Sequence, residues 1–301
     1  MTPEIVVVPD PAALARQAAE RFVALARQAI AHRERFSVAL SGGSTPRDLY
    51  ALLAAPEFAA QVDWARVYFF WGDERAVPPD DPASNFRMAY ETLLSRVPAP
   101  PENIFRIPAE KEPQQAAREY DGTLREFFKW DASPSKEGAE RGQTRTPSVI
   151  ARRRFGPTKQ SSIRELKIAS QKPLAMTSPN PRSSALVRVP YFPRLDLILL
   201  GLGANGHTAS LFPHTAVLRV TTRWVEAEYV AEVKMNRITL TAPVINAARN
   251  ILFLVSGADK AQTVHAVLRG EYRPDDLPAQ LIQPTDGALV WLLDRAAASA
   301  L

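Results

Sequence analysis

Hydrophobic positions along residues 1–128 fall into short apolar runs separated by longer amphipathic stretches. Residues 5–8 form a β-branched run, and residues 11–32 follow with apolar side chains at helical spacing. The same succession then repeats. The next predicted strands are 36–40 and 67–71, the next predicted helices begin near Pro46 and cover 85–95 and 114–128, and a short apolar stretch lies at 104–107. This half of the chain therefore predicts strands that alternate with helices.

The same pattern returns from residue 195. Residues 195–200 are continuously apolar, as expected of a strand that is buried on both faces. Further predicted strands are 224–230, 250–255 and 289–293, and the predicted helices are 244–248 and 260–269. Because strands alternate with helices in both halves, we expect an α/β fold. Its core would be a Rossmann-like, open, mainly parallel sheet with helices on both faces.

Residues 129–190 break this pattern. They are rich in Ser, Pro, Arg and Lys, and their apolar residues recur with neither the helical nor the strand period. Such a composition buries too little surface to offset the chain entropy of folding, so we expect a mostly disordered insertion. The predicted organisation is one α/β domain, with its first part at 1–128 and its second part at 191–301.

The charge of the chain is concentrated in this insertion. The whole chain carries 37 Lys and Arg and 32 Asp and Glu residues, whereas residues 129–188 alone carry 13 basic and 4 acidic ones. The rest is mildly acidic and gives no general argument for a nucleic-acid partner. The insertion could be a basic arm that binds an acidic partner. We favour a tolerated loop, or a stretch of foreign sequence from a reading-frame error.

Composition narrows the possible chemistry and location. The chain has no cysteine, which excludes disulfides, thiolate metal sites and cysteine nucleophiles, and its four histidines are too scattered to suggest a metal site. No apolar stretch reaches the ~20 residues of a membrane-spanning helix. The first residues show no signal peptide. We therefore expect a cytoplasmic protein without a membrane partner.

The first candidate site follows the predicted strand 36–40 and opens a helix. Glycines allow a backbone to approach a ligand closely, and a helix N-terminus favours a phosphate group. Thr45 is the expected N-cap and Pro46 the first helical residue. No Gly-Lys-Ser/Thr follows, so the loop is not a P-loop. The alternative is a plain strand–helix turn. The candidate phosphate ligands are Ser41, Gly42, Gly43, Ser44 and Thr45.

The second candidate site, at residues 72–75, follows the predicted strand 67–71 directly. It places Asp73 and Glu74 beside Arg75 in what we expect to be a loop. These groups could orient a polar substrate or bind an anion. The alternative is a solvated acidic turn with a local ion pair.

The third candidate site is the loop at 201–213, which reads GLGANGHTASLFP. Its glycines match the GxGxxG pattern of dinucleotide-binding folds, and Glu226 and Glu228 lie at the distance of a ribose-binding acid. Pro213 argues against this alternative, because a long helix should still be running there. We expect His207 at a helix N-terminus, where the helix dipole would lower its pKa and favour the neutral imidazole of a general base.

All three loops leave the carboxyl ends of predicted strands, where open α/β sheets bind ligands. A phosphate loop, a charged pair and a histidine at one edge predict an enzyme that acts on a small phosphorylated molecule.

The motifs resemble those of the 6-phosphogluconolactonase family, over roughly residues 4–128 and 194–297. The shared strings are SGGSTP at 41–46, WGDER at 71–75, SN at 84–85, GLGANGHTASLFP at 201–213, RITLT at 237–241, VINAARNILFLVSGADKA at 244–261 and LPAQLI at 277–282. The resemblance implies hydrolysis of 6-phospho-D-glucono-1,5-lactone to 6-phosphogluconate in the oxidative branch of the pentose phosphate pathway, without a cofactor or metal. The family often has aspartate where this chain has Asn205. An asparagine can orient a group but cannot act as a base.

In the expected mechanism His207 is the general base that activates water. Asp73 and Asn205 would orient His207, the water or the sugar hydroxyls. Arg75 and backbone N–H groups would meet the charge that develops on oxygen. Arg237 and Lys260 would help the 41–45 loop to hold the phosphate.

Three alternatives remain open at this point. They are a sugar-phosphate deaminase or isomerase of the same fold, a dinucleotide-dependent oxidoreductase, and a non-enzymatic sugar-phosphate sensor or a protein recruited through the basic arm. The expected partner is the small lactone, with nucleic acid binding only through the insertion. We expect a monomer or a small homo-oligomer.

Overall fold

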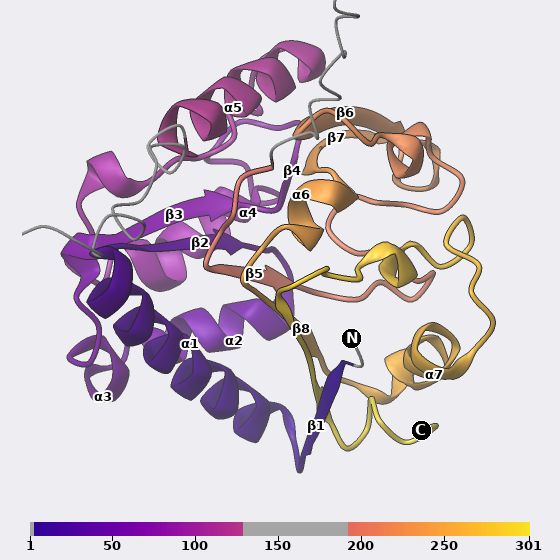
Figure 1. The fold of residues 1–301 in the computed structure, drawn as a ribbon, viewed down its shortest axis with the longest axis horizontal. Coiled ribbons are helices and arrows are strands. Elements are labelled where there is room, and N and C mark those ends of the chain that lie inside the picture. Colours follow the sequence, from indigo (N-terminus) through magenta and orange to yellow (C-terminus); the bar gives the residue numbers. More distant parts are fainter. Residues whose placement is uncertain (1–2, 129–191) are drawn as a thin grey trace, which may run out of the picture. The chain divides into compact units, whose positions relative to one another are not determined.

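The computed structural model describes residues 3–128 and 192–301, and the predicted insertion at 129–190 lies outside them. Six strands form a sheet in which every hydrogen-bonded pair is parallel (Figure 1). In sheet order they are β1 (Glu4–Val8), β9 (Ala288–Asp294), β8 (Asn250–Val255), β5 (Leu197–Leu200), β2 (Phe36–Leu40) and β3 (Val67–Trp71). The predicted open, parallel α/β architecture is confirmed.

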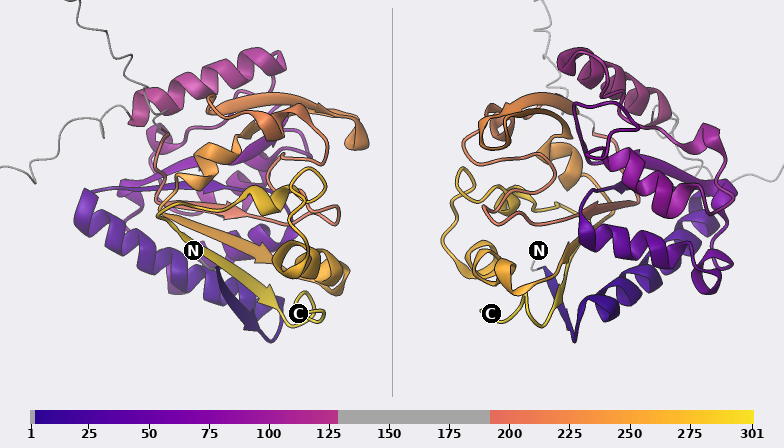
Figure 2. Two further views of the ribbon diagram at one scale, coloured as in Figure 1. Left: turned by 45° about the vertical axis from the view of Figure 1, so that its right-hand side comes forward. Right: turned by 180° about the vertical axis from the view of Figure 1, so that it is seen from behind.

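Helices cover both faces of this sheet. They are α1 (Pro11–Arg33), α2 (Ser44–Leu53), α3 (Pro56–Ala59), α4 (Asn85–Ala89), α5 (Pro113–Phe128), α6 (Ala242–Asn246) and α7 (Ala261–Arg269). Successive side chains of a strand point to opposite faces. Phe36 of β2 packs edge-on against Phe22 of α1, whereas Phe70 of β3 packs against Phe127 and Phe128 of α5. The two helices therefore lie on opposite faces, as both views in Figure 2 show.

A second, smaller sheet is antiparallel and was not predicted. It consists of β4 (Asp73–Arg75), β7 (Met235–Leu240) and β6 (Val225–Val230), in the order β4-β7-β6. Only β6 was expected as a strand. The prediction of a loop at 72–75 is wrong, because residues 73–75 pair with β7. A three-residue strand has no periodicity of its own, and its partner lies far along the chain.

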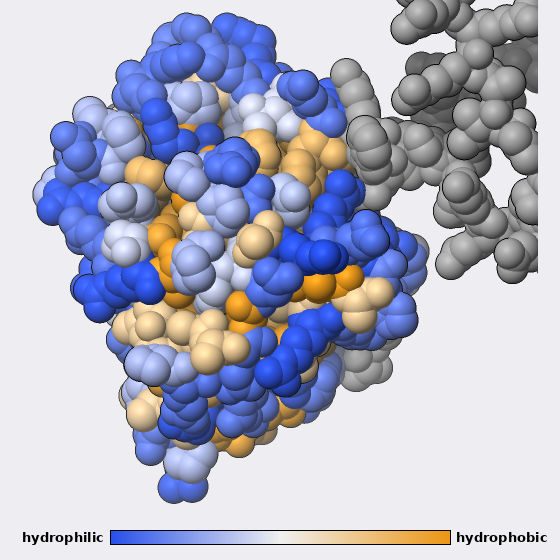
Figure 3. All heavy atoms as spheres, turned by 90° about the vertical axis from the view of Figure 1, so that its left-hand side faces the viewer, coloured by the Kyte–Doolittle hydropathy of each residue, from blue (hydrophilic) through white to orange (hydrophobic). Residues whose placement is uncertain are grey.

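The apolar core fills the space between these layers. Its largest fully buried side chains include Trp71, Trp291, Tyr50, Tyr120 and Phe22. Figure 3 shows one outer face, where hydrophilic residues predominate and apolar ones appear in small groups. Within residues 3–128 and 192–301, no helix combines the length and the apolar composition that crossing a membrane requires.

Two buried tyrosines fix the backbone at the carboxyl ends of β2 and β3. The Tyr50 hydroxyl accepts a hydrogen bond from the Ser41 N–H (3.0 Å) and donates one to the Ser41 carbonyl (2.9 Å). The Tyr120 hydroxyl does the same with the N–H (2.8 Å) and carbonyl (3.0 Å) of Trp71. Burial raises the pKa of both hydroxyls, so both stay protonated and able to donate.

We expect Tyr120→Phe to destabilise the fold by about 1–3 kcal/mol, because it leaves two buried backbone groups of Trp71 without a partner. Equilibrium urea unfolding measures this loss. Tyr90→Phe, which removes the hydroxyl of an exposed tyrosine, is the matched control and should change stability little. Equal effects of the two substitutions would show that the Tyr120 hydroxyl does not fix the Trp71 backbone.

Candidate active site

The candidate site is a cavity of about 490 Å³ at the carboxyl edge of the parallel sheet. Its walls come from the segments that follow β2, β3 and β5 and from the end of β8, which are four neighbouring strands. From β2 the chain proceeds outward to β3, and from β5 it proceeds in the opposite direction to β8 and β9. Ligands of open α/β sheets bind at such a reversal of strand order.

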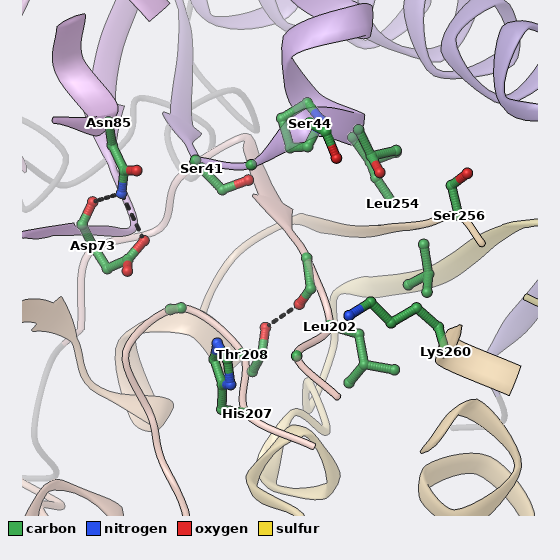
Figure 4. A pocket seen from close by; sticks show the side chains of 18 of the residues that line it. Ser41, Ser44, Asp73, Asn85, Leu202, His207, Thr208, Leu254, Ser256 and Lys260 are labelled. Atoms are coloured by element: carbon green, nitrogen blue, oxygen red, sulfur yellow. Dashed lines mark hydrogen bonds between the residues drawn. The ribbon is translucent and has the colours of Figure 1, made fainter. Parts of the chain in front are cut away.

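The cavity brings together nearly all the site residues predicted from the sequence. Its lining includes Ser41, Gly42, Gly43, Ser44, Thr45, Asp73, Arg75, His207, Arg237 and Lys260. Asn205 is outside this lining and contacts the His207 ring instead. In Figure 4, Asp73 and Asn85 lie on one side of the pocket and Ser256 and Lys260 on the opposite side.

The loop after β2 presents a helix N-terminus to the cavity, but the expected cap is wrong. Helix α2 begins at Ser44, and its N-cap is Gly43, whose carbonyl accepts the first helical hydrogen bond from the Arg47 N–H (3.2 Å). Thr45 therefore lies in the first turn of the helix. This shift leaves the residues that line the cavity unchanged, and the unpaired N–H groups of the first turn remain suited to a phosphate.

Glu74 is a buried structural group rather than part of a solvated acidic turn. Its carboxylate accepts hydrogen bonds from the N–H groups of Arg75 (2.8 Å), Asn85 (2.7 Å) and Phe86 (2.8 Å), and from the Ser84 hydroxyl (3.1 Å). Burial raises the pKa of Glu74, while the three backbone hydrogen bonds oppose that rise. The carboxylate thereby fixes the start of α4 against β4.

Asn85 occupies the space beside Gly42 and contacts Asp73. A Cβ atom at position 42 would overlap the Asn85 amide oxygen, so only glycine permits this approach. The Asn85 amide nitrogen donates to the Asp73 carbonyl (2.9 Å) and side chain (3.4 Å), and the Ser210 hydroxyl donates to the same carboxylate (2.7 Å). Sequence reasoning assigned no role to Asn85 or Ser210. Their motifs lie in the shared strings, but only the fold places them beside Asp73.

The pKa of His207 is lowered by burial and not by the helix dipole that the sequence predicted. From Gly203 to Pro213 the described chain forms turns, so His207 does not begin a helix. Burial lowers the pKa of His207 to about 4. The ring stacks on Phe212 with centroids 4.0 Å apart, and a Cβ at Gly203 would overlap it. Its Nδ1 lies 2.5 Å from the Asn205 amide oxygen.

The two arginines of the site lie side by side on neighbouring strands of the second sheet. Arg75 of β4 is the register partner of Arg237 of β7. Their Nε atoms are buried and lack a hydrogen-bond partner among the residues that the structure describes. Burial lowers the pKa of Arg237 and the neighbouring Arg75 adds to this, while Asp73 opposes it. Half-buried cations in this arrangement favour an anionic ligand.

Lys260 enters the cavity from a loop that is held by the last strand. The Asp294 carboxylate, at the end of β9, accepts hydrogen bonds from the Ser256 hydroxyl (2.6 Å) and the Gly257 N–H (3.1 Å). Lys260 follows in a 3₁₀ turn and lies 3.1 Å from Asp259. The loop therefore places an ammonium group on the side of the cavity opposite Asp73 (Figure 4).

The geometry does not support the dinucleotide alternative. A dinucleotide fingerprint needs a helix that starts at its glycines, and here turns follow β5. Glu226 and Glu228 belong to β6 of the second sheet. Glu226 is ion-paired with Arg223 (2.6 Å), and Glu228 accepts a hydrogen bond from the Val217 N–H (3.0 Å).

Comparison with known proteins extends over nearly the whole chain. A sequence profile of the family described as glucosamine-6-phosphate isomerases/6-phosphogluconolactonase matches residues 9–142 and 156–291. The 6-phosphogluconolactonase of Synechocystis sp. is 34% identical over 298 residues, covering 99% of this chain and 98% of that protein. The 6-phosphogluconolactonase of Nostoc sp. is also 34% identical, over 305 residues, covering 100% of this chain and 99% of that protein.

A solved structure agrees with these sequence matches. The 6-phosphogluconolactonase from Trypanosoma brucei superposes with a TM-score of 0.71 at 26% identity, covering 100% of this chain and 99% of that one. The resemblance inferred from the sequence motifs is thus confirmed. The chain belongs to the glucosamine-6-phosphate isomerase/6-phosphogluconolactonase family.

Proposed function

We propose that this chain hydrolyses 6-phospho-D-glucono-1,5-lactone to 6-phosphogluconate. The observation that carries the proposal is the state of His207. Its Nδ1 lies 2.5 Å from the Asn205 amide oxygen, burial lowers its pKa to about 4, and its cavity also contains a helix N-terminus and three cationic side chains. The names of the Synechocystis and Nostoc relatives support the same activity.

The proposed reaction needs one general base. Nε2 of His207 takes a proton from water as the water oxygen bonds to the C1 carbonyl carbon, and the carbonyl electrons move to its oxygen. The Arg75 guanidinium and backbone N–H groups of the glycine-rich loops stabilise this oxyanion. When the carbonyl re-forms, the bond from C1 to the ring oxygen breaks. The histidinium returns its proton to that oxygen, and the new carboxylic acid ionises to the carboxylate.

The phosphate of the substrate would bind to the loop at residues 41–45. The N–H groups and the dipole at the N-terminus of α2 favour a dianion, and Lys260 and Arg237 would add positive charge. Asp73, held by Asn85 and Ser210, would orient the attacking water or a sugar hydroxyl. Holding the remote phosphate would position C1 near His207.

Other expectations accompany this proposal. A cytoplasmic address, a monomer or small homo-oligomer, and nucleic-acid binding only through residues 129–190 all stay predictions. The division of one domain into 1–128 and 191–301 also stays a prediction.

The first test is loss of the lactone, generated in situ, measured against its spontaneous hydrolysis. His207→Ala should lower kcat by ~10²–10⁴-fold, the usual contribution of a general base. His265→Ala, which removes an exposed histidine on α7, is the matched control. Glucosamine 6-phosphate tests the deaminase alternative, and its turnover in place of the lactone would overturn the proposal.

The pH profile should reflect the lowered pKa of His207. A base works in its unprotonated form, so a pKa of about 4 keeps the site active as the pH falls well below the ordinary histidine value. We expect the acid limb of kcat to have its midpoint near pH 4. The substrate phosphate also titrates, at about pH 6, and would contribute to the kinetic profile. NMR titration of the His207 ring should therefore accompany the kinetics. A ring pKa near that of free histidine would contradict the burial argument.

Lys260→Ala should weaken use of the phosphorylated substrate specifically. Loss of a charge-assisted hydrogen bond lowers kcat/KM by about 10- to 100-fold. Hydrolysis of unphosphorylated glucono-1,5-lactone should be unaffected by the same change. Lys111→Ala removes a surface lysine that is paired with Glu119 and serves as the control. Equal losses with both lactones would remove Lys260 from the phosphate site.

A further inference from the structure

Asn205 connects the His207 ring to a carboxylate from another part of the chain. The Asn205 amide oxygen accepts a hydrogen bond from the His207 backbone N–H (3.1 Å) and lies 2.5 Å from Nδ1 of the ring. The Asn205 amide nitrogen donates to Glu232 (2.7 Å). Glu232 belongs to a short 3₁₀ turn, Ala231–Val233, between β6 and β7.

The chemistry of these three groups permits one arrangement of protons. An ionised carboxylate only accepts hydrogen bonds, so Glu232 requires the NH₂ end of the Asn205 amide. The amide oxygen must then face His207, where it meets the backbone N–H. An oxygen at this distance from Nδ1 requires Nδ1 to carry the ring proton. Nε2 is consequently left with the free lone pair that a base needs.

We propose that Glu232 is a positioning residue, which holds the Asn205 amide in one orientation and thereby fixes the tautomer of His207. The proposal rests on the proposed function only where it treats His207 as the base. Glu232 does not line the cavity, so it acts through Asn205 and not on the substrate.

The neutral Asn205 amide, which lies between the Glu232 carboxylate and the His207 ring, also limits the effect of that negative charge on the ring. The charged side chains that act on His207 are Asp73 of β4, Glu232, Arg237 of β7 and Lys260. Glu232 and Asp73 favour the protonated ring, whereas burial and the two cations favour the neutral one. The amide conveys the orienting hydrogen bond and keeps the Glu232 carboxylate out of direct contact with the imidazole. The ring is thus held in place without being driven toward imidazolium.

The first experiment measures the tautomer itself and does not depend on catalysis. In the full chain labelled with ¹⁵N-histidine, the two ring nitrogens of His207 have distinct shifts, and the His207→Ala variant identifies them. We expect the Nδ1–H form to predominate. In Glu232→Ala we expect the Nε2–H form to become detectable, because the amide is held less firmly. Glu57→Ala, which removes an exposed glutamate bound to Arg16, should leave the spectrum unchanged.

The second experiment compares Glu232→Ala in two backgrounds. With Asn205 present, Glu232→Ala should lower kcat about three- to tenfold with little change in KM, the equivalent of one hydrogen bond. In the Asn205→Asp background the same change should leave kcat unchanged or raise it. A carboxylate at 205 has no N–H to offer Glu232 and accepts from Nδ1 with either oxygen. A carboxylate at position 205 raises the pKa of His207, so rates are measured over a range of pH and compared where kcat no longer changes with pH in each variant.

The outcomes distinguish the role of Glu232 in positioning Asn205 from the proposed hydrolysis of the lactone. A predominant Nε2–H ring in the parent chain, or an unchanged tautomer in Glu232→Ala, would overturn it. Equal losses of kcat in both backgrounds would also overturn it, because Glu232 would then act independently of the amide. If the chain fails to hydrolyse the lactone, the proposed function fails, and the NMR result alone still decides the role of Glu232.

Discussion

One buried carboxylate, Glu74, joins β4 to the start of α4, and both elements contribute polar side chains to the cavity. A buried charge persists only where hydrogen bonds replace its lost hydration, and Glu74 obtains them from its neighbour Arg75 and from the first residues of α4. This requirement draws α4 against β4 and sets Asn85 between Gly42 and Asp73. The spacing between the loops that follow β2 and β3 therefore depends on Glu74.

The second sheet adds an electrostatic requirement of its own. Like charges directly opposite each other in neighbouring strands are destabilising, yet β4 and β7 set Arg75 opposite Arg237. Asp73 offsets part of this repulsion, and a bound anion would offset more. The Arg75 Nη1 donates to the Ala83 carbonyl, whereas the Nε atoms of both arginines lack a partner among the described residues, so this pair of cations favours a negatively charged ligand.

Strong local patterns made the parallel sheet and its helices predictable, since continuous apolar runs such as 195–200 and amphipathic stretches such as 11–32 leave little ambiguity. The loops after β2, β3 and β5 were predictable as cavity walls because they follow strands, whereas Arg237 lies within β7. Strand β4 was missed because three polar residues carry no period and gain their partner from β7. The roles of Asn85 and Ser210 depend on tertiary contacts with Asp73, and the pKa of His207 depends on burial, which the sequence does not display.

The Asp294 carboxylate has a consequence for the order in which the molecule matures. Asp294 is the last residue of β9, and its carboxylate secures the Ser256–Gly257 turn that leads to Lys260. During synthesis the segments containing Ser41, Asp73 and His207 leave the ribosome well before β9. The lysine loop acquires its anchor only when β9 has inserted between β1 and β8. The position of Lys260 in the site therefore depends on a part of the chain that is synthesised after all the loops that contribute Ser41, Asp73 and His207.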